Sequence, residues 1–281
     1  MADVHDELIG SYTTQTLSSA ATGTDYRLFT ADFGDAPETL VVATDANIVF
    51  ATAVQLISGL HLVGLVPDLR LVGVGYAGAT SVVETIGPRS RDLTPCPTEW
   101  QPQAGGGPQF ARCVIDEILP MVSEHWSGDA ADLVYFGHSF GGLFGVDLLL
   151  SGSSPFGKYI LGSPSLWWGP YEMTRREAAF AETHDDLVAE VYTAIGGWET
   201  DEGRRRESVN LPEGHPMKAP PIFLDMVADL DAFTESITGR EYPSLSWTRQ
   251  VIENEVHIAA GPVVLTRGLR HFYGDRNADT P

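Results

Sequence analysis

The chain has 281 residues, 43% of them hydrophobic, and a formal net charge of −21 at pH 7. This length allows one large α/β domain with a substantial core. The negative charge argues against nucleic acid and anionic membranes as partners. No stretch approaches the roughly 20 apolar residues that span a bilayer. Because the acidic N-terminus also lacks the layout of a signal peptide, we expect a cytoplasmic protein.

Strands and helices alternate along the chain, as indicated by the spacing of its apolar residues. In chain order they are strand 26–33, strand 40–44, helix 50–60, strand 69–76, loop 90–108, helix 110–126, strand 133–136, helix 143–150, strand 158–162, helix 171–183, strand 187–195, helix 222–238, strand 245–252 and helix 262–272. This alternation predicts a largely parallel sheet with helices on both faces. No break in composition marks a boundary, so we expect a single domain over residues 1–281, with a loop or cap-like insertion at 203–221.

The two cysteines, Cys96 and Cys113, belong to no C-x-x-C or Cys/His pattern with the spacing of metal ligands. We therefore expect free thiols, no metal site and no cofactor. The sequence does not indicate an oligomeric state.

The most informative segment joins strand 133–136 to helix 143–150. Residues 137–142 read Gly-His-Ser-Phe-Gly-Gly. A Gly-x-Ser-x-Gly between strand and helix is the nucleophile elbow of an α/β-hydrolase, in which the serine occupies a strained turn. Side chains two residues on either side would collide with the crossing helix and strand, so glycine is needed there. We predict the α/β-hydrolase fold, with Ser139 as the nucleophile and His138 as a structural residue whose side chain points away from the site.

Chain order narrows the candidates for the catalytic histidine, because this fold places the serine first, then the acid, then the histidine. Of the eight histidines, only His215, His257 and His271 follow the strand expected to carry the acid. His257 follows strand 245–252, and open α/β sheets place their chemistry at such carboxyl ends. His271 is a cation near the end of the closing helix, where it complements the helix dipole. We predict His257, with His215 as the alternative.

The acid is expected just after strand 187–195. Its carboxylate must accept the proton of histidine Nδ1, which orients the ring and stabilises its charged form. The candidates there are Glu199, Asp201 and Glu202. Glu199 lies nearest the strand end, just after a glycine pair that can turn sharply. We predict Glu199, with Asp201 as the alternative.

An oxyanion hole needs two backbone N–H donors aimed at the developing negative charge. The residue after the nucleophile, Phe140, supplies one of them. The second normally comes from the turn after the third strand, which we take to be strand 69–76. We predict the Tyr76 amide as this donor, with Gly75 as the alternative.

Several segments in order along the chain resemble one esterase family of the α/β-hydrolases. That family contains esterase D, feruloyl esterases, mycolyltransferases and trilactone siderophore esterases. Its discriminating matches are Arg-Asp-Leu-Thr-Pro at 91–95 and Ser-Pro-Ser-Leu-Trp-Trp at 163–168. The generic matches are the turn at 44–50, strand 72–76, the elbow at 137–142, Gly-Gly-Trp-Glu at 196–199 and Glu-Val-His at 255–257. The resemblance is greatest to the siderophore esterases, and it implies that the acid is Glu199 rather than Asp201.

These residues together predict a serine carboxylic ester hydrolase that uses a Ser-His-Glu triad and an acyl-enzyme. Its partner would be a small-molecule ester, such as a siderophore or aromatic ester. The alternatives are an acyltransferase of the same fold and a non-catalytic binding protein.

The substrate is the least determined part of the prediction. We assign Trp167, Trp168 and Arg91 to substrate binding, although the tryptophans would equally suit packing of their loop. Residues 204–206 are three arginines in a very acidic chain. They would either hold an anionic ligand or form surface pairs with Glu202 and Glu207.

Overall fold

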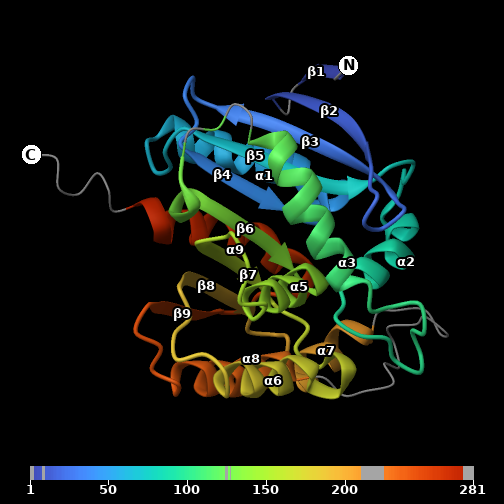
Figure 1. The fold of residues 1–281 in the computed structure, drawn as a ribbon, viewed down its shortest axis with the longest axis vertical. Coiled ribbons are helices and arrows are strands. Elements are labelled where there is room, and N and C mark those ends of the chain that lie inside the picture. Colours follow the sequence, from blue (N-terminus) through green and yellow to red (C-terminus); the bar gives the residue numbers. More distant parts are fainter. Residues whose placement is uncertain (1–2, 8–9, 124–125, 127, 210–224, 275–281) are drawn as a thin grey trace, which may run out of the picture.

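A computed structural model describes residues 3–7, 10–123, 126, 128–209 and 225–274. Its described strands form one nine-stranded sheet in the order β1-β2-β3-β5-β4-β6-β7-β8-β9 (Figure 1). Their bounds are β1 Asp3–Glu7, β2 Gly10–Ser18, β3 Asp25–Phe33, β4 Thr39–Ala43, β5 Leu69–Tyr76, β6 Leu133–His138, β7 Lys158–Gly162, β8 Ala189–Gly196 and β9 Leu245–Ile252. Neighbouring strands from β5 to β9 pair in parallel, whereas β1, β2 and β3 pair antiparallel. This is the predicted, mostly parallel α/β-hydrolase sheet.

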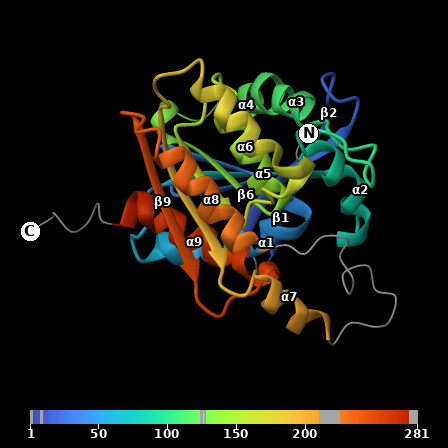
Figure 2. The same cartoon turned by 90° about the horizontal axis from the view of Figure 1, so that it is seen from below.

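Helices cover both faces of this sheet (Figure 2). Their bounds are α1 Ala46–Leu62, α2 Val82–Asp92, α3 Gly107–Arg112, α4 Leu119–Val122, α5 Phe140–Leu149, α6 Trp168–Ala181, α7 Asp201–Ser208, α8 Met226–Thr238 and α9 His257–Tyr273. Helices α1 and α9 pack together on one face, and α5 and α8 pack against strands on the other. Strands β4 and β7 are buried along their whole length, as expected for parallel strands covered on both sides.

Several elements differ from the sequence-based prediction. The hairpin of β1 and β2 was not predicted, because β2 is polar and lacks alternating apolar residues. Helix α2 extends to Asp92, into the segment predicted to be a loop, and it accommodates Pro88. Helix α9 begins at His257 rather than at residue 262. Proline favours the first turn of a helix, which is why the sequence indicates a later start, but Pro262 lies in the second turn.

The insertion predicted at 203–221 is helical in its first part, because α7 extends to Ser208. Its remainder from residue 210 lies outside the described residues. The predicted start of the next helix at residues 222–224 also lies outside them, and α8 begins at Met226.

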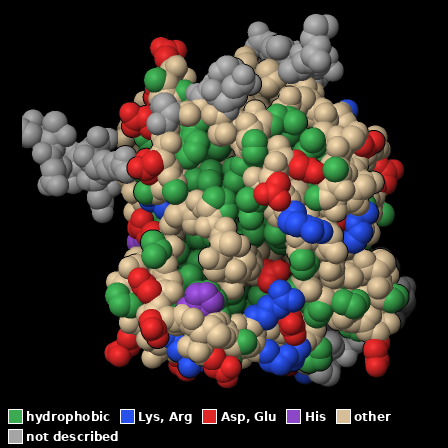
Figure 3. All heavy atoms as spheres, in the orientation of Figure 1, with side chains coloured by type: hydrophobic (Ala, Val, Ile, Leu, Met, Phe, Trp, Pro, Cys, Tyr) green, Lys and Arg blue, Asp and Glu red, His purple; other side chains and the backbone are tan. Residues whose placement is uncertain are grey.

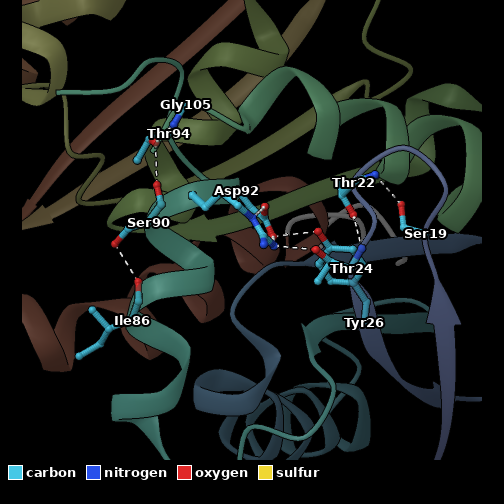
Figure 4. A network of polar contacts seen from close by, with 10 residues as sticks. Ser19, Thr22, Thr24, Tyr26, Ile86, Ser90, Asp92, Thr94 and Gly105 are labelled. Carbon is cyan, nitrogen blue, oxygen red and sulfur yellow. Dashed lines mark hydrogen bonds and ion pairs between the residues drawn. The ribbon is translucent and has the colours of Figure 1, made fainter. Parts of the chain in front are cut away.

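The Arg-Asp-Leu-Thr-Pro segment closes helix α2 with a buried polar network (Figure 4). Tyr26 Oη donates to Asp92 Oδ2 at 2.8 Å, and the Arg91 guanidinium holds both carboxylate oxygens of Asp92. Arg91 Nη2 also donates to Thr24 Oγ1 at 2.8 Å. Thr94 Oγ1 accepts from the Gly105 amide at 2.9 Å, which joins the two ends of the loop that follows α2. The network thus fixes the base of a loop that carries Trp100.

Replacing Asp92 with Ala is expected to lower the free energy of unfolding by about 1–3 kcal/mol, because it leaves the buried phenol of Tyr26 without its acceptor. The side chain of Asp92 is only 2% exposed. Denaturant melts would measure the loss. The matched control is Asp32→Ala, since Asp32 forms a similar two-pronged pair with Arg70 but is 43% exposed. Exposed pairs of this kind contribute about 0.2–1 kcal/mol, so equal losses in the two variants would contradict the role given to the network.

On the face drawn in Figure 3, apolar side chains gather near the middle, with carboxylates spread around them. Both cysteines are free thiols, as predicted. Within the described ranges, no helix combines the length and apolar character that crossing a membrane would require.

Candidate active site

Ser139 occupies a strained turn between β6 and α5. Its backbone angles, φ 62° and ψ −116°, are rarely adopted by residues other than glycine. Its amide donates to the Gly162 carbonyl at 2.8 Å, and its carbonyl accepts from the Leu143 amide at 2.9 Å, so both sides of the turn are held. A Cβ at Gly141 would strike the side chain of Thr44. The local structure is therefore that of the predicted elbow, and the glycine is needed for the close approach of β4.

Glu199 and His257 lie together at the carboxyl ends of β8 and β9. His257 Nδ1 and Glu199 Oε2 are 2.5 Å apart, and Glu199 is only 1% exposed. The loops that carry them are joined by backbone hydrogen bonds, from Gly197 to Ile252 and from Trp198 to Glu255. These bonds align the two loops, so residues 58 positions apart in the chain meet at one edge of the sheet.

Among the described residues, neither Asp201 nor His271 makes this contact. Asp201 forms an ion pair with Arg205 at 2.7 Å on the surface of α7. His271 lies in the last turn of α9, where its Nε2 is 3.9 Å from Glu190 Oε1. His215 lies outside the described residues.

Two serines that follow β7 complete the surroundings of Ser139 and Glu199. Ser163 is fully buried, and its hydroxyl donates to Glu199 Oε1 at 2.6 Å. Ser165 Oγ lies 3.5 Å from Ser139 Oγ. Neither serine was predicted to have a role in the site. Strand β7 lies between the strand of the serine and the strand of the acid, so the turn after β7 had to fall between them.

The hydrogen bonds to Glu199 favour its charged form. Burial by itself raises the pKa of this carboxyl, but hydrogen bonds from His257, Ser163 and the Gly196 amide outweigh it, and the pKa lies below its usual value. Glu199 Oε1 accepts from both Ser163 and the Gly196 amide, the latter at 2.9 Å. A charged acceptor is therefore held in place behind the His257 ring.

His138 does not point away from this group, contrary to the prediction. Its ring lies against the His257 ring, with centroids 4.7 Å apart, and its Nε2 is 2.9 Å from the His257 carbonyl oxygen. His138, the residue before Ser139, therefore contacts His257, the histidine that is bound to Glu199.

The two predicted oxyanion donors are placed differently. Phe140 is the first residue of α5, so its N–H has no acceptor within the helix. The Tyr76 N–H is not available, because it donates to Asn47 Oδ1 at 2.7 Å. Tyr76 ends β5, and β4 lies between β5 and β6, which puts Tyr76 a further strand, roughly 5 Å, from the serine. Choosing Tyr76 was wrong because strand order along the chain differs from strand order in the sheet.

The turn after β4 lies next to the elbow, and it was not predicted to supply an oxyanion donor. Asp45 precedes α1 in a left-handed conformation, with φ 58°, and its carboxylate makes no hydrogen bond to the helix amides. Both oxygens of Asp45 instead bind Arg89, at 2.8 and 2.9 Å, and the Arg89 guanidinium lies 5.0 Å from the centre of the Phe140 ring. The first amides of α1 therefore lack a side-chain cap beside the elbow.

The three residues assigned to substrate binding have different environments. Trp168 is fully buried, and its Nε1 donates to the Cys96 carbonyl at 2.8 Å, so it packs its loop rather than lining a pocket. Arg91 is held by Asp92 and Thr24. Trp167 is half-buried, and its ring lies 6.1 Å from the Phe140 ring, centre to centre. It stacks on Trp100, a 45% exposed residue that the prediction omitted, at 5.9 Å and 22°.

The three arginines of α7 are engaged by neighbours in the chain. Arg205 pairs with Asp201, and Arg206 pairs with Glu202 at 2.6 Å and lies over the Trp198 ring. Arg204 Nη2 contacts Met226 Sδ at 2.8 Å. The arrangement matches the surface-pair interpretation for Arg206 and Glu202. Among the residues that the structure describes, no group of three or more His, Cys, Asp or Glu could hold a metal ion.

Comparison with known proteins identifies relatives across most of the chain, although no protein-family model matches it. The chain is 30% identical over 248 residues to ferri-bacillibactin esterase BesA of Bacillus subtilis, covering 82% of this chain and 77% of that protein. It is 26% identical over 254 residues to the siderophore triacetylfusarinine C esterase of Aspergillus fumigatus, covering 86% and 84%.

Among solved structures, siderophore hydrolase EstB from Aspergillus nidulans has the same fold, with a TM-score of 0.78 and 23% identity. The match covers 98% of this chain and 99% of that one. Three observations favour an esterase: the strained turn at Ser139, the contact between Glu199 and His257, and the 30% identity to BesA. This chain is an esterase, and it belongs to the α/β-hydrolase esterase family that includes ferri-bacillibactin esterase BesA.

Proposed function

We propose that the chain is a serine carboxylic ester hydrolase that acts through Ser139, His257 and Glu199, with siderophore esters as its substrates. The observation that carries this proposal is the 2.5 Å contact of His257 Nδ1 with a buried carboxylate, beside a serine in a strained turn. The substrate class is supported by the relatives, which are named as esterases of ferri-bacillibactin and triacetylfusarinine C.

In the first half-reaction, Ser139 Oγ attacks the ester carbonyl carbon and His257 Nε2 takes the hydroxyl proton. The charge that forms on His257 is stabilised by Glu199, whose pKa is already lowered by its hydrogen bonds. When the tetrahedral intermediate collapses, the bond to the alcohol oxygen breaks, and His257 returns the proton to that oxygen. An acyl group remains on Ser139.

In the second half-reaction, water attacks the acyl carbon and His257 takes a proton from it. The bond to Ser139 Oγ then breaks, and Oγ recovers the proton. We assign the oxyanion donors to the Phe140 N–H and to an N–H in the turn from Asp45 to Asn47. Strand β4 adjoins β6, and the uncapped start of α1 carries partial positive charge.

An active-site label tests the assignment of the nucleophile without knowledge of the natural substrate. A fluorophosphonate forms a P–O bond with an activated serine and loses fluoride. Intact-mass measurement should give one adduct on the wild-type chain, peptide mapping should place it on Ser139, and His257→Ala should slow labelling strongly. An adduct on any other serine would refute the assignment.

A panel of esters tests the substrate class. Simple acyl esters, a feruloyl ester and ferric siderophore esters of the catecholate and hydroxamate types would be compared by kcat/KM. The proposal expects a ferric siderophore ester to be the best substrate. Cleavage of simple acyl esters alone would contradict the siderophore role and leave the serine mechanism in place.

Trp100 is expected to contribute to binding of bulky or aromatic groups, because the stacked rings of Trp100 and Trp167 lead outward from Phe140. Losing one aromatic contact costs about 1 kcal/mol, so Trp100→Ala should raise KM for a feruloyl ester roughly fivefold while leaving KM for an acetyl ester nearly unchanged. Trp126→Ala is the matched control, because Trp126 is bound to the Glu38 carbonyl far from this loop. An equal change for both esters would argue against a stacking role.

A further inference from the structure

His138 contacts His257 in two ways. Its ring lies 4.7 Å from the His257 ring, centre to centre, with an interplanar angle of 37°. Its Nε2 is 2.9 Å from the backbone oxygen of His257. His257 is the first residue of α9, so this contact fixes the helix start as well as the ring.

The space for the His138 ring is made by two glycines from different elements. A Cβ at Gly162, the last residue of β7, would come within 2.7 Å of His138 Nδ1. A Cβ at Gly261 in α9 would come within 3.2 Å of His138 Cγ. Distances this short leave no room for a larger residue without movement of the ring. The ring is therefore held between β7 and α9.

The protonation state of His138 follows from its partners. A carbonyl oxygen can only accept, so Nε2 carries a proton. His138 Nδ1 is sealed from solvent and has no hydrogen-bond partner among the described residues. Removal from water and the neighbouring His257 lower the pKa of His138 to about 3. At neutral pH His138 is a neutral ring with its single proton on Nε2.

We propose that His138 is a positioning residue for His257: its N–H bond to the His257 carbonyl and its ring contact hold the His257 imidazole in line between Glu199 and Ser139. This inference rests on the proposed serine mechanism. Glu199 binds one atom of the imidazole, Nδ1, and leaves rotation about that bond open. The His138 contacts hold His257 at two further points, its backbone carbonyl and the face of its ring.

The neutrality of His138 suits this position. During the reaction His257 gains a proton, and a second charge on the ring beside it would oppose that gain. His138 cannot easily become charged, because its Nδ1 is sealed from solvent and has no acceptor among the described residues, and the loss of hydration outweighs the attraction of Glu199. The pair can therefore carry one positive charge, on His257, where the proton transfer needs it.

The test separates the donor from the bulk of the side chain. His138→Met keeps an unbranched side chain of similar length but removes the donor. His138→Gln retains an N–H group that can reach the His257 carbonyl. We expect His138→Met to lower kcat for p-nitrophenyl butyrate by about 10²-fold, the loss typical of a misplaced catalytic group, with KM within twofold of the wild type. His138→Gln should recover at least tenfold of that loss.

The position of the His257 proton gives a readout that a loss of packing alone would not change. The Nδ1–H proton shared with Glu199 is expected at low field in the proton NMR spectrum. It should be seen in the wild type and in His138→Gln, and it should be broadened or lost in His138→Met.

His184 offers a matched control on the same chain. Its ring stacks on Phe180 at 3.9 Å and its Nδ1 is 3.1 Å from the Phe180 carbonyl oxygen, so it repeats both contacts at a site remote from Ser139. His184→Met should leave kcat unchanged. Melting temperatures of all variants would show whether each is folded at the assay temperature.

The inference is overturned if folded His138→Met retains kcat within twofold of the wild type, or if folded His138→Gln is as slow as His138→Met. Either result would leave the proposed function intact, provided that Ser139→Ala is inactive. Full activity in Ser139→Ala would instead overturn the proposed function itself.

Discussion

Ser139→Ala is expected to lower kcat for p-nitrophenyl butyrate by about 10⁴- to 10⁶-fold, because removal of the nucleophile of a triad leaves only the catalysis by binding and the oxyanion donors. KM should change little, since the hydroxyl contributes mainly to the chemical step. Initial rates over a range of substrate concentrations would measure both constants.

A serine at the opposite end of the same helix provides the control for this substitution. Ser151 lies just beyond α5, where its hydroxyl donates to the Leu148 carbonyl at 2.7 Å, and Ser151→Ala should keep full activity. Circular dichroism would confirm that both variants are folded. If Ser139→Ala kept more than about one hundredth of the wild-type kcat, Ser139 would not be the nucleophile of a triad.

Glu199→Gln is expected to lower kcat by about 10⁴-fold, the loss that follows when the triad acid becomes an amide. The amide has nearly the same shape, but it cannot stabilise the charged ring of His257, and its NH₂ group favours the wrong ring tautomer. The matched control is Asp201→Asn, because Asp201 lies two residues away and pairs with Arg205 on the surface. A larger loss for Asp201→Asn would transfer the role of the acid to Asp201.

The same substitution should change how stability depends on pH. The pKa of Glu199 is lower in the folded chain than its usual value of 4.5. The folded state therefore binds the proton more weakly than the unfolded state, and the charged carboxylate stabilises the fold above pH 4.5. This contribution is lost as the pH falls through the lower, folded-state pKa.

The free energy of unfolding of the wild type, minus that of Glu199→Gln, should therefore shrink as the pH is lowered from neutral through this window. Denaturant melts of both proteins at a series of pH values would measure the difference. A difference that grew on acidification would contradict a lowered pKa at Glu199.

The positions of Ser139, Glu199 and His257 could be predicted because each follows a strand whose apolar residues are plain in the sequence. In a parallel sheet the carboxyl ends of the strands share one edge, so residues that follow β6, β8 and β9 must lie at the same edge. The choice of Glu199 as the predicted acid also came from position, since Glu199 is the first carboxylate after β8. The contact between Glu199 and His257 is then a consequence of strand order rather than of any single residue.

The second oxyanion donor could not be predicted in this way. Strand β5 follows β4 in the chain, but β4 is the neighbour of β6 in the sheet. Counting strands along the sequence therefore leads to Tyr76, whereas the sheet puts the turn after β4 beside Ser139. The side chain of Asn47, which occupies the Tyr76 amide, lies at the start of α1, and only the tertiary structure brings the two together.

The aromatic residues show the same limit. Trp167 and Trp168 are equivalent in the sequence, yet Trp167 is half-buried beside Phe140 and Trp168 is fully buried, with its indole bound to the Cys96 carbonyl. Trp100 joins them from a loop about 67 residues earlier, because the network around Asp92 holds the base of that loop.

The sequence by itself determined the fold class and predicted the elbow at Ser139 and the pairing of Glu199 with His257, because these depend on local patterns and on the order of elements along the chain. The tertiary structure alone decided which backbone amides and aromatic rings surround Ser139, and that His138 lies against His257. Those contacts join residues distant in the chain, and the packing of strands, helices and loops, not the spacing of residues, sets them.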